Sequence, residues 1–293
     1  MPINFLDDNH FELNGLTFEY GFSMEHSMSP SSSHAAFVMK HRTQIERYEK
    51  FLGGREFRNV VELGIFYGGS AIFLDRLLHP HRLVALDIRA EPASALTHYR
   101  ETFDRSDAVH AYYGVDQSDK ARLTSILDEV FGDESIDLVI DDASHAYGAT
   151  VASFEAIFPR LRSGALYIVE DWDFMHLLAA AMEKVLQDPS HPRHEAAKEA
   201  LIAGMRRKTP MQPELGRFAM EAALMTAGTS DLVREVRVRA NWIIIERGSG
   251  HIDFATARLD KLAPDRFQVL RPLADTPDLD APNVLSALFF GMR

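Results

Sequence analysis

The stretch IDLVIDDASH, residues 136–145, places an apolar β-strand directly before two adjacent carboxylates. A second stretch of the same kind, ALYIVEDW at residues 165–172, also runs from apolar residues into an acidic pair. Carboxylates are rarely buried unless they are paired or bound to a metal ion. If the two strands are neighbours in a parallel sheet, their ends lie about 5 Å apart. The acids then meet at one point, which favours a divalent cation with oxygen ligands.

Strand and helix patterns alternate along residues 60–170. Apolar, β-rich runs predict strands at residues 60–64, 83–88, 109–113, 136–141 and 165–170. Helical spacing predicts helices at residues 70–78, 120–131 and 150–161, and Pro92 is expected just inside a further helix. This alternation is typical of an α/β protein with a doubly wound, Rossmann-like and mostly parallel sheet.

The alternation ends after residue 172. Residues 174–230 are predicted to form a helical insertion, whose methionines either fill gaps between helices or line an adaptable lid. Residues 233–239 and 242–246 then predict an antiparallel C-terminal hairpin, which brings the sheet to seven strands. We therefore divide the chain into an amino-terminal arm with helices (1–50), a core (51–173), the insertion (174–230), and the final hairpin with its tail (231–293).

Composition narrows the classes of function. The 293 residues include 31 Lys and Arg against 43 Asp and Glu, and the net charge of −12 disfavours nucleic acid or an anionic membrane as the main partner. There is no cysteine, which excludes disulfides, thiolate metal sites and cysteine nucleophiles. No signal-peptide pattern opens the chain, and no apolar stretch approaches the ~20 residues that span a bilayer. We expect a cytoplasmic protein with a small-molecule substrate, and the apolar tail suggests a possible homo-oligomer.

The turn after the first strand, ELGIFYGGS at residues 62–70, carries glycines where the backbone must bend or approach a ligand. It is not G-x-G-x-x-G, because Phe66 stands at the second glycine, and it is not a Walker loop. Asp87 ends the second strand, where an acid can accept hydrogen bonds from ribose hydroxyls or cap a helix. Asp116 and Gln117 follow the third strand and could contact a base, although Asp116 could equally be a cap.

These motifs resemble those of class I S-adenosylmethionine-dependent methyltransferases. More narrowly, they are similar to the metal-dependent O-methyltransferases of macrolide-sugar tailoring (mycinamicin and tylosin pathway type) and the cephalosporin-hydroxylase-like proteins. The matching text is ELG…GGS, GVDQSD, IDDASH and YIVED, within residues 55–172, and the similarity extends to the 233–246 hairpin. The resemblance implies S-adenosylmethionine contacts from Glu62, Gly64, Gly68, Ser70, Asp87, Asp116, Gln117 and Asp141. It further implies a magnesium ion held by Asp142, Glu170 and Asp171, with His145 as the general base.

The function expected from this resemblance is a Mg²⁺-dependent O-methyltransferase acting on a hydroxyl of a small polyol, such as a sugar of a natural product. A bound Mg²⁺ would stabilise the developing alkoxide, and an imidazole with a pKa near ~6.5 suits a base at pH 7. The acceptor is not implied, because the continuation WDFMH after Asp171 departs from the family's pattern. Two alternatives stay open: a metal-independent methyltransferase that uses His145 alone, and a non-catalytic cofactor-binding or scaffold protein. The acids could also be mere helix caps.

Overall fold

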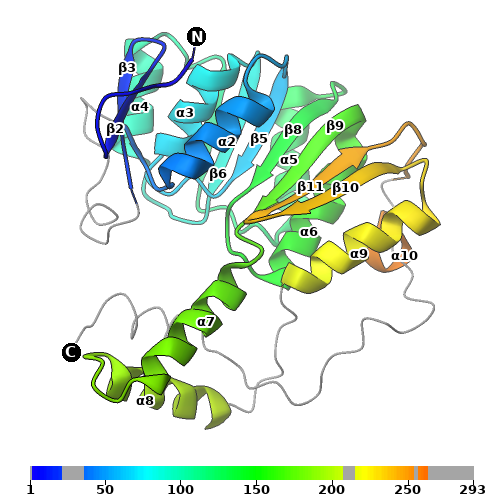
Figure 1. Cartoon of the computed structure of the whole chain (residues 1–293). Coiled ribbons are helices and arrows are strands. Elements are labelled where there is room, and N and C mark those ends of the chain that lie inside the picture. The colour runs from blue at the N-terminus through cyan, green and yellow to red at the C-terminus, as the bar shows by residue number, and fades with distance from the viewer. Residues whose placement is uncertain (1, 22–35, 207–214, 254–256, 263–293) are drawn as a thin grey trace.

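A seven-stranded sheet lies at the centre of the molecule (Figure 1). The computed structural model describes residues 2–21, 36–206, 215–253 and 257–262. The strands of this sheet are β5 (Asn59–Leu63), β6 (Arg82–Asp87), β7 (Val109–Tyr113), β8 (Ile136–Asp141), β9 (Leu161–Glu170), β10 (Val233–Arg239) and β11 (Trp242–Arg247). Their order is β10-β11-β9-β8-β5-β6-β7. Strand β11 runs antiparallel to β9 and β10, whereas β5–β6, β5–β8, β6–β7 and β8–β9 pair in parallel. The predicted α/β fold with its C-terminal hairpin is confirmed.

Helices cover both faces of this sheet (Figure 1), and its central strands are therefore buried on both faces. Every residue of β5 and β8 is buried, as expected of strands between two helical layers. The helices that connect the strands are α3 (Gly69–Leu78), α4 (Ser94–Thr102), α5 (Lys120–Phe131) and α6 (Tyr147–Ile157). Alternate strand residues enter two separate clusters. Val61 packs with residues of α5 and α6 in one cluster, and Val60 packs with residues of α3 and α4 in the other.

The predicted boundaries of two helices and one strand are corrected by the structure. Pro92 precedes its helix, since α4 begins at Ser94 with Ala93 as the N-cap residue. The helix expected to reach residue 161 ends at Ile157, and a 3₁₀ turn, η1 (Phe158–Arg160), follows it. Pro159 lies in that turn and has no backbone N–H to continue the α-helical ladder. Strand β9 therefore starts at Leu161, earlier than its apolar run suggests.

The first 50 residues contain strands in addition to the arm and helices expected there. Strands β1 (Asn4–Phe5), β2 (His10–Leu13), β3 (Leu16–Tyr20) and β4 (Ala36–Val38) form a small sheet, and α2 (Arg42–Leu52) follows. The rings of Phe11 and Phe18 stack at 4.9 Å, and both meet Phe73 of α3 edge-on. A Cβ on Gly69 would lie 1.8 Å from the carbonyl oxygen of Phe37. The small sheet is therefore held tightly against the start of α3.

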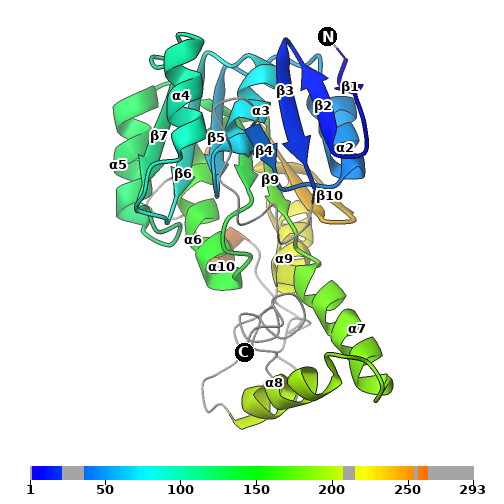
Figure 2. The same cartoon turned by 90° about the vertical axis from the view of Figure 1, so that its left-hand side faces the viewer.

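The helical insertion divides into two parts. Helix α9 (Leu215–Gly228) packs on the main sheet, where Phe218 meets Phe154 of α6 at 5.4 Å. Helices α7 (Phe174–Gln187) and α8 (His194–Arg206) project from the body instead (Figures 1 and 2). Their contact is a separate cluster of Leu178, Met182, Val185, Ala197 and Ala200. A lid function for this insertion stays a prediction.

A short helix, α10 (Leu259–Leu262), completes the described chain and packs into the cluster that contains α9. Among the residues that the structure describes, no helix is both long and apolar enough to cross a membrane. The apolar tail at residues 284–290, from which we expected a possible homo-oligomer, lies outside the described residues, as does the serine-rich arm at residues 23–34.

Candidate functional site

The carboxyl ends of β5, β8 and β9 bring the predicted acids to one edge of the sheet. Strand β5 stands where the strand order reverses, between β8 and β6, and ligands of open α/β sheets bind at such a point. Asp142 directly follows β8, and Glu170 ends the neighbouring strand β9. Their carboxylates meet at a side chain that the sequence did not single out, Lys40.

Lys40 follows β4 and bridges the two acids. Its Nζ donates to Asp142 Oδ2 at 2.9 Å and also to Glu170 Oε2, and the residue is only 4% exposed. Glu170 Oε1 accepts two more hydrogen bonds, one from the Tyr48 hydroxyl of α2 and one from Trp242 Nε1 at 2.7 Å. Burial alone would raise the pKa of Glu170, but the charge of Lys40 and these donors hold it below its ordinary value. Glu170 is therefore a charged carboxylate that is neutralised inside the protein.

This arrangement does not fit a magnesium ion shared by Asp142, Glu170 and Asp171. Both oxygens of Glu170 already accept hydrogen bonds from the protein. A dication about 4 Å from the Lys40 ammonium would be repelled by about 8 kcal/mol at an effective dielectric constant near 20. Burial also raises the pKa of Asp142 well above its ordinary value. Repulsion from Glu170 and Asp171 adds to that shift, and Lys40 opposes it.

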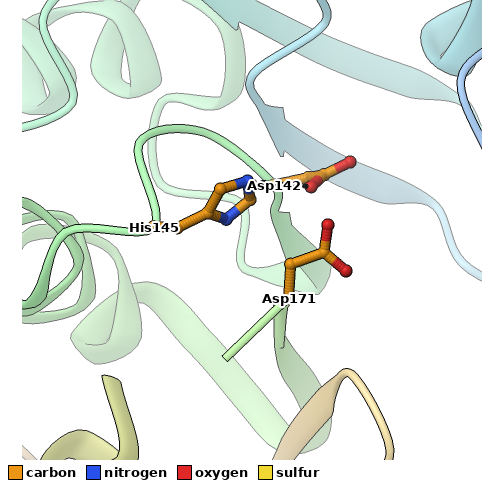
Figure 3. A group of neighbouring side chains, drawn as sticks. All are labelled: Asp142, His145 and Asp171. Carbon is orange, nitrogen blue, oxygen red and sulfur yellow. Dashed lines mark ion pairs between the residues drawn. The ribbon is translucent and has the colours of Figure 1, made fainter. Parts of the chain in front are cut away.

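A different trio of side chains does lie within range of a single ion. Ligand atoms of Asp142, His145 and Asp171 are all within 4.8 Å of one another, and Figure 3 shows the His145 ring beside both carboxylates. This set contains an imidazole, whereas Mg²⁺ prefers oxygen ligands. Metal binding would also occupy the ring that the resemblance assigns to proton transfer. This trio therefore does not fit a catalytic magnesium ion either.

His145 occupies the loop between β8 and α6 with its backbone in the left-handed region, at a φ of 52°. Its Nε2 lies 4.0 Å from Asp142 Oδ1, and its ring centre lies 5.8 Å from that of Phe174. Burial lowers the pKa of His145 and outweighs the opposing effect of Asp171 and Glu170. The imidazole is consequently neutral near pH 7, the form that can accept a proton.

Asp171 is held by the turn of the C-terminal hairpin. Its Oδ1 accepts a hydrogen bond from Asn241 Nδ2 at 3.2 Å, and its backbone N–H donates to the Asn241 carbonyl at 2.7 Å. Arg47 of α2 donates to the same turn, at the carbonyl of Ala240, at 2.7 Å. The hairpin and α2 thus fix the position of this acid from two sides.

Glu62, one of the predicted cofactor residues, is buried with one carboxyl oxygen unpaired. It is 1% exposed, and its Oε2 has no hydrogen-bond partner. Burial raises the pKa of Glu62 to about 8, although a hydrogen bond with Ser70 lowers it. An orphaned buried carboxyl oxygen beside the turn fits a ligand that brings a positive charge or a donor. S-adenosylmethionine carries such groups, so the site fits this cofactor.

The predicted glycines are required by chain packing. A Cβ on Gly64 would lie 2.3 Å from the Asp142 carbonyl oxygen, and one on Gly68 would lie 2.7 Å from Leu96 Cβ. Both glycines also have positive φ, at 83° and 85°, a conformation that favours glycine. Their direct contact with a cofactor stays a prediction, but Gly64 brings the turn after β5 against the segment that carries Asp142.

Asp87 is predicted to contact the cofactor, and its carboxylate already accepts hydrogen bonds from backbone groups near the turn after β5. Its Oδ2 accepts hydrogen bonds from the backbone N–H of Ile65 at 3.0 Å and of Phe66 at 2.7 Å. Its Oδ1 accepts from the backbone N–H of Arg89 at 2.8 Å. An ionised carboxylate has about four acceptor positions, so one remains for a ribose hydroxyl.

Asp141, Gln117 and Asp116 are also hydrogen-bonded within the protein. The Asp141 carboxylate accepts from Gln117 Nε2 at 2.6 Å and from the hydroxyls of Ser153 and Tyr167, each at 3.0 Å. Burial raises the pKa of Asp141 to about 6 against these hydrogen bonds. Asp116 is exposed and accepts from the backbone and hydroxyl of Ser118 at 2.7 Å. The network through Gln117 shapes the loop after β8, and a cofactor role for these three residues stays a prediction.

Lys40, Tyr48 and Trp242 belong to this site, but the sequence analysis did not identify them. Lys40 is 102 residues from Asp142 and 130 residues from Glu170 along the chain. Nothing in a single sequence links positions so far apart. The one available signal is that Glu170 ends an apolar strand and, once buried, needs donors.

Replacing Glu62 with Gln should make the protein less sensitive to alkaline pH. The folded-state pKa of about 8 exceeds the ordinary 4.5. The unfolded chain therefore loses its proton first, and Glu62 destabilises the fold increasingly as pH rises between these values. By linkage, wild type should lose about 3 kcal/mol relative to Glu62→Gln between pH 5.5 and pH 8. Urea unfolding of both proteins at several pH values measures this difference, and parallel curves would contradict the prediction.

Comparison with known proteins places this site in a recognised domain. Residues 61–172 match a protein family described as a methyltransferase domain. That stretch includes the turn after β5, Asp87, the loop with His145, and both acids at the end of β9.

Residues 61–172 form a methyltransferase domain.

Two curated relatives resemble parts of the chain. The chain is 45% identical over 67 residues to 8-demethyl-8-alpha-L-rhamnosyl tetracenomycin-C 2'-O-methyltransferase of Streptomyces olivaceus; the match covers 23% of the chain and 17% of the relative. It is 33% identical over 128 residues to demethylmacrocin O-methyltransferase of Streptomyces fradiae; the match covers 40% of the chain and 29% of the relative. The chain thus matches less than a third of either relative's length.

Solved structures of methyltransferases are similar to the chain at lower identity. MycE methyltransferase of the mycinamycin biosynthetic pathway, in complex with Mg and SAH, is 21% identical with a TM-score of 0.46; the match covers 74% of the chain and 53% of MycE. The O-methyltransferase TomG of Streptomyces achromogenes, in complex with SAM, is 18% identical with a TM-score of 0.46; the match covers 77% of the chain and 90% of TomG.

Proposed function

We propose that the chain is an S-adenosylmethionine-dependent O-methyltransferase that acts on a hydroxyl of a small polyol, a sugar of a natural product. The methyltransferase domain supports methyl transfer as the reaction class. The names of the two curated relatives support transfer to an oxygen atom, and one of them names a rhamnosyl compound. The observation that carries the proposal is His145. It is a neutral imidazole beside Asp142, at the sheet edge where this fold binds ligands.

The proposed chemistry assigns separate tasks to the residues around the loop. The cofactor would supply an activated methyl group, and Glu62, Gly64 and Asp87 are the residues placed to hold it. His145 takes the proton of the acceptor hydroxyl at a ring nitrogen. Asp142, 4.0 Å from Nε2 in this structure, stabilises the imidazolium that results. Positioning the hydroxyl in line with the methyl group supplies much of the remaining acceleration.

The magnesium requirement implied by the resemblance is not part of this proposal. MycE was solved with Mg, but in this chain Lys40 stands between two of the three expected ligands. The contacts of Lys40 favour the alternative in which methyl transfer proceeds without a metal ion and with His145 as the base. A scaffold role without catalysis has no comparable support.

Calorimetry with S-adenosylhomocysteine and a transfer assay with methyl-labelled S-adenosylmethionine test the proposal. We expect saturable 1:1 binding that is the same with and without Mg²⁺, and label transfer to deoxysugar glycosides that carry free hydroxyls. Adenosine monophosphate, which lacks the methionine part, serves as the control ligand. No heat with S-adenosylhomocysteine under either condition would refute the proposal and favour a scaffold.

A further inference from the structure

The acid cluster at the ends of β8 and β9 already contains a cation that belongs to the chain. Lys40 Nζ lies between Asp142 Oδ2, at 2.9 Å, and Glu170 Oε2. The lysine is 4% exposed, and lysines are almost never buried to this degree unless they are paired. We propose that Lys40 is the resident cation of this cluster and takes the place of a divalent metal ion, so that the native protein binds no Mg²⁺ there.

The ammonium group of Lys40 reaches the cluster from the end of the amino-terminal sheet. Strand β4 pairs in parallel with β3, and the approach of Phe37 to Gly69 holds it against α3. A backbone hydrogen bond of 2.8 Å from Lys40 to the Val38 carbonyl then turns the chain toward the cluster. The small sheet therefore contributes a charged group to the site and is not merely an addition to the fold.

Further contacts keep the Lys40 side chain in place. Nζ lies 5.3 Å from the ring centre of Tyr48, within the range of a cation–π contact. The hydroxyl of the same tyrosine donates to Glu170, as does the indole of Trp242. Withdrawal of Lys40 would break its ion pairs with the buried Glu170 and the part-buried Asp142, and would leave Glu170 with neutral donors only. These contacts favour a permanent occupant over one that yields to a metal ion.

Lysine and metal ion are thus alternative occupants of the same two carboxylates. Removing the lysine charge leaves Asp142 and Glu170 without a counter-charge, and Asp171 stands close to Asp142. Two or three carboxylates are the kind of donor set that Mg²⁺ and Mn²⁺ prefer. Replacing Lys40 with an uncharged residue of similar length should therefore create a metal site.

The inference rests on the proposed function for the role of the cluster: Lys40 is a positioning residue that acts through Asp142 on His145. Its test needs neither acceptor nor turnover. Full-length wild type, Lys40→Met and Lys50→Met are titrated with Mn²⁺ and followed by electron paramagnetic resonance, and their Tm is measured with and without Mg²⁺. Lys50 is an exposed lysine of α2 and is the matched control.

We expect wild type and Lys50→Met to bind no Mn²⁺ with a Kd below about 1 mM, and Lys40→Met to bind one ion at least about tenfold more tightly than they do. Mg²⁺ should raise the Tm of Lys40→Met alone, by about 3 °C or more. Stoichiometric Mn²⁺ binding by wild type would overturn the inference, and so would Lys40→Met that folds and binds no ion.

A second variant covers the case in which Lys40→Met does not fold. The double variant Lys40→Met/Glu170→Gln removes one charge of each sign and should fold without gaining the tight Mn²⁺ site. If it binds Mn²⁺ as tightly as Lys40→Met is expected to, Glu170 is not a partner of the displaced cation and the inference fails. Failure of the proposed function would appear separately, as absent S-adenosylhomocysteine binding in wild type.

Discussion

Replacing His145 with Ala should lower kcat by about 10²- to 10⁴-fold, the range typical for loss of a general base. The lowered pKa of this histidine keeps its ring neutral near pH 7, and its Nε2 lies 4.0 Å from Asp142. The alanine variant cannot take the acceptor proton, but the turn after β5 that is proposed to bind the cofactor remains. S-adenosylhomocysteine affinity should therefore change by less than about threefold. Single-turnover transfer of labelled methyl, together with calorimetry, measures both quantities.

The His145 prediction has a matched control in the same chain. His81 is an exposed histidine just before β6, and His81→Ala should leave both kcat and cofactor affinity unchanged. If His145→Ala retains more than about a tenth of wild-type kcat, the base lies elsewhere. If cofactor affinity falls together with kcat, His145 acts mainly by shaping the loop, since its φ of 52° is a conformation that alanine adopts less readily.

Strand positions in the core could be predicted because a strand that is buried on both faces is rich in apolar residues. Strands β5 and β8 consist mainly of Val, Ile and Leu, and the structure buries all of their residues, Glu62 and Asp137 included. The hairpin of β10 and β11 could be predicted as well, since Val233–Arg239 alternates and Trp242–Arg247 begins with four apolar residues. Helix ends were less visible, because Pro159 ends α6 within a pattern that otherwise continues to residue 161.

The amino-terminal sheet carried a signal that the sequence analysis did not use. Asn14-Gly15 separates His10–Leu13 from Leu16–Tyr20, and an Asn-Gly pair between alternating apolar residues is a strong indication of a hairpin. Both turn residues have positive φ, at 49° and 77°. The Asn-Gly turn is a local signal and lies outside the α/β alternation that starts at β5.

Of the candidate site, only the positions of the acidic residues could be predicted from the sequence. Strand ends indicate where Asp142 and Glu170 lie, since register in a parallel sheet brings neighbouring ends together. The identity of the cation between them depends on a tertiary contact from β4, for which the local sequence around Lys40 gives no indication. The same reasoning that brought the carboxylates together therefore inferred a metal ion where the structure has an ammonium group.

Replacing Glu170 with Ala should destabilise the protein by about 3–5 kcal/mol, a typical cost of breaking a buried ion pair by removing one partner. Glu170 is 1% exposed and accepts hydrogen bonds from Lys40, Tyr48 and Trp242. The alanine variant leaves the indole and hydroxyl donors without their acceptor and Lys40 with Asp142 alone. Each buried donor without a partner costs about 1–3 kcal/mol. Urea unfolding at pH 7 measures the change.

Glu246→Ala is the matched control, because Glu246 lies on the neighbouring strand β11 and pairs with Arg234 and Arg237, whose side chains are 56% and 27% exposed. Each pair with a solvent-accessible arginine contributes at most about 1 kcal/mol, so the loss for Glu170→Ala should be larger by about 1 kcal/mol or more. Equal losses of unfolding free energy would mean that the ion pair between Lys40 and Glu170 contributes little to stability. The inference that Lys40 is the resident cation of the cluster would then lose its support. Glu170→Gln distinguishes charge from hydrogen bonding: it retains an acceptor for Tyr48 and Trp242, so its loss should fall between those of the two alanine variants.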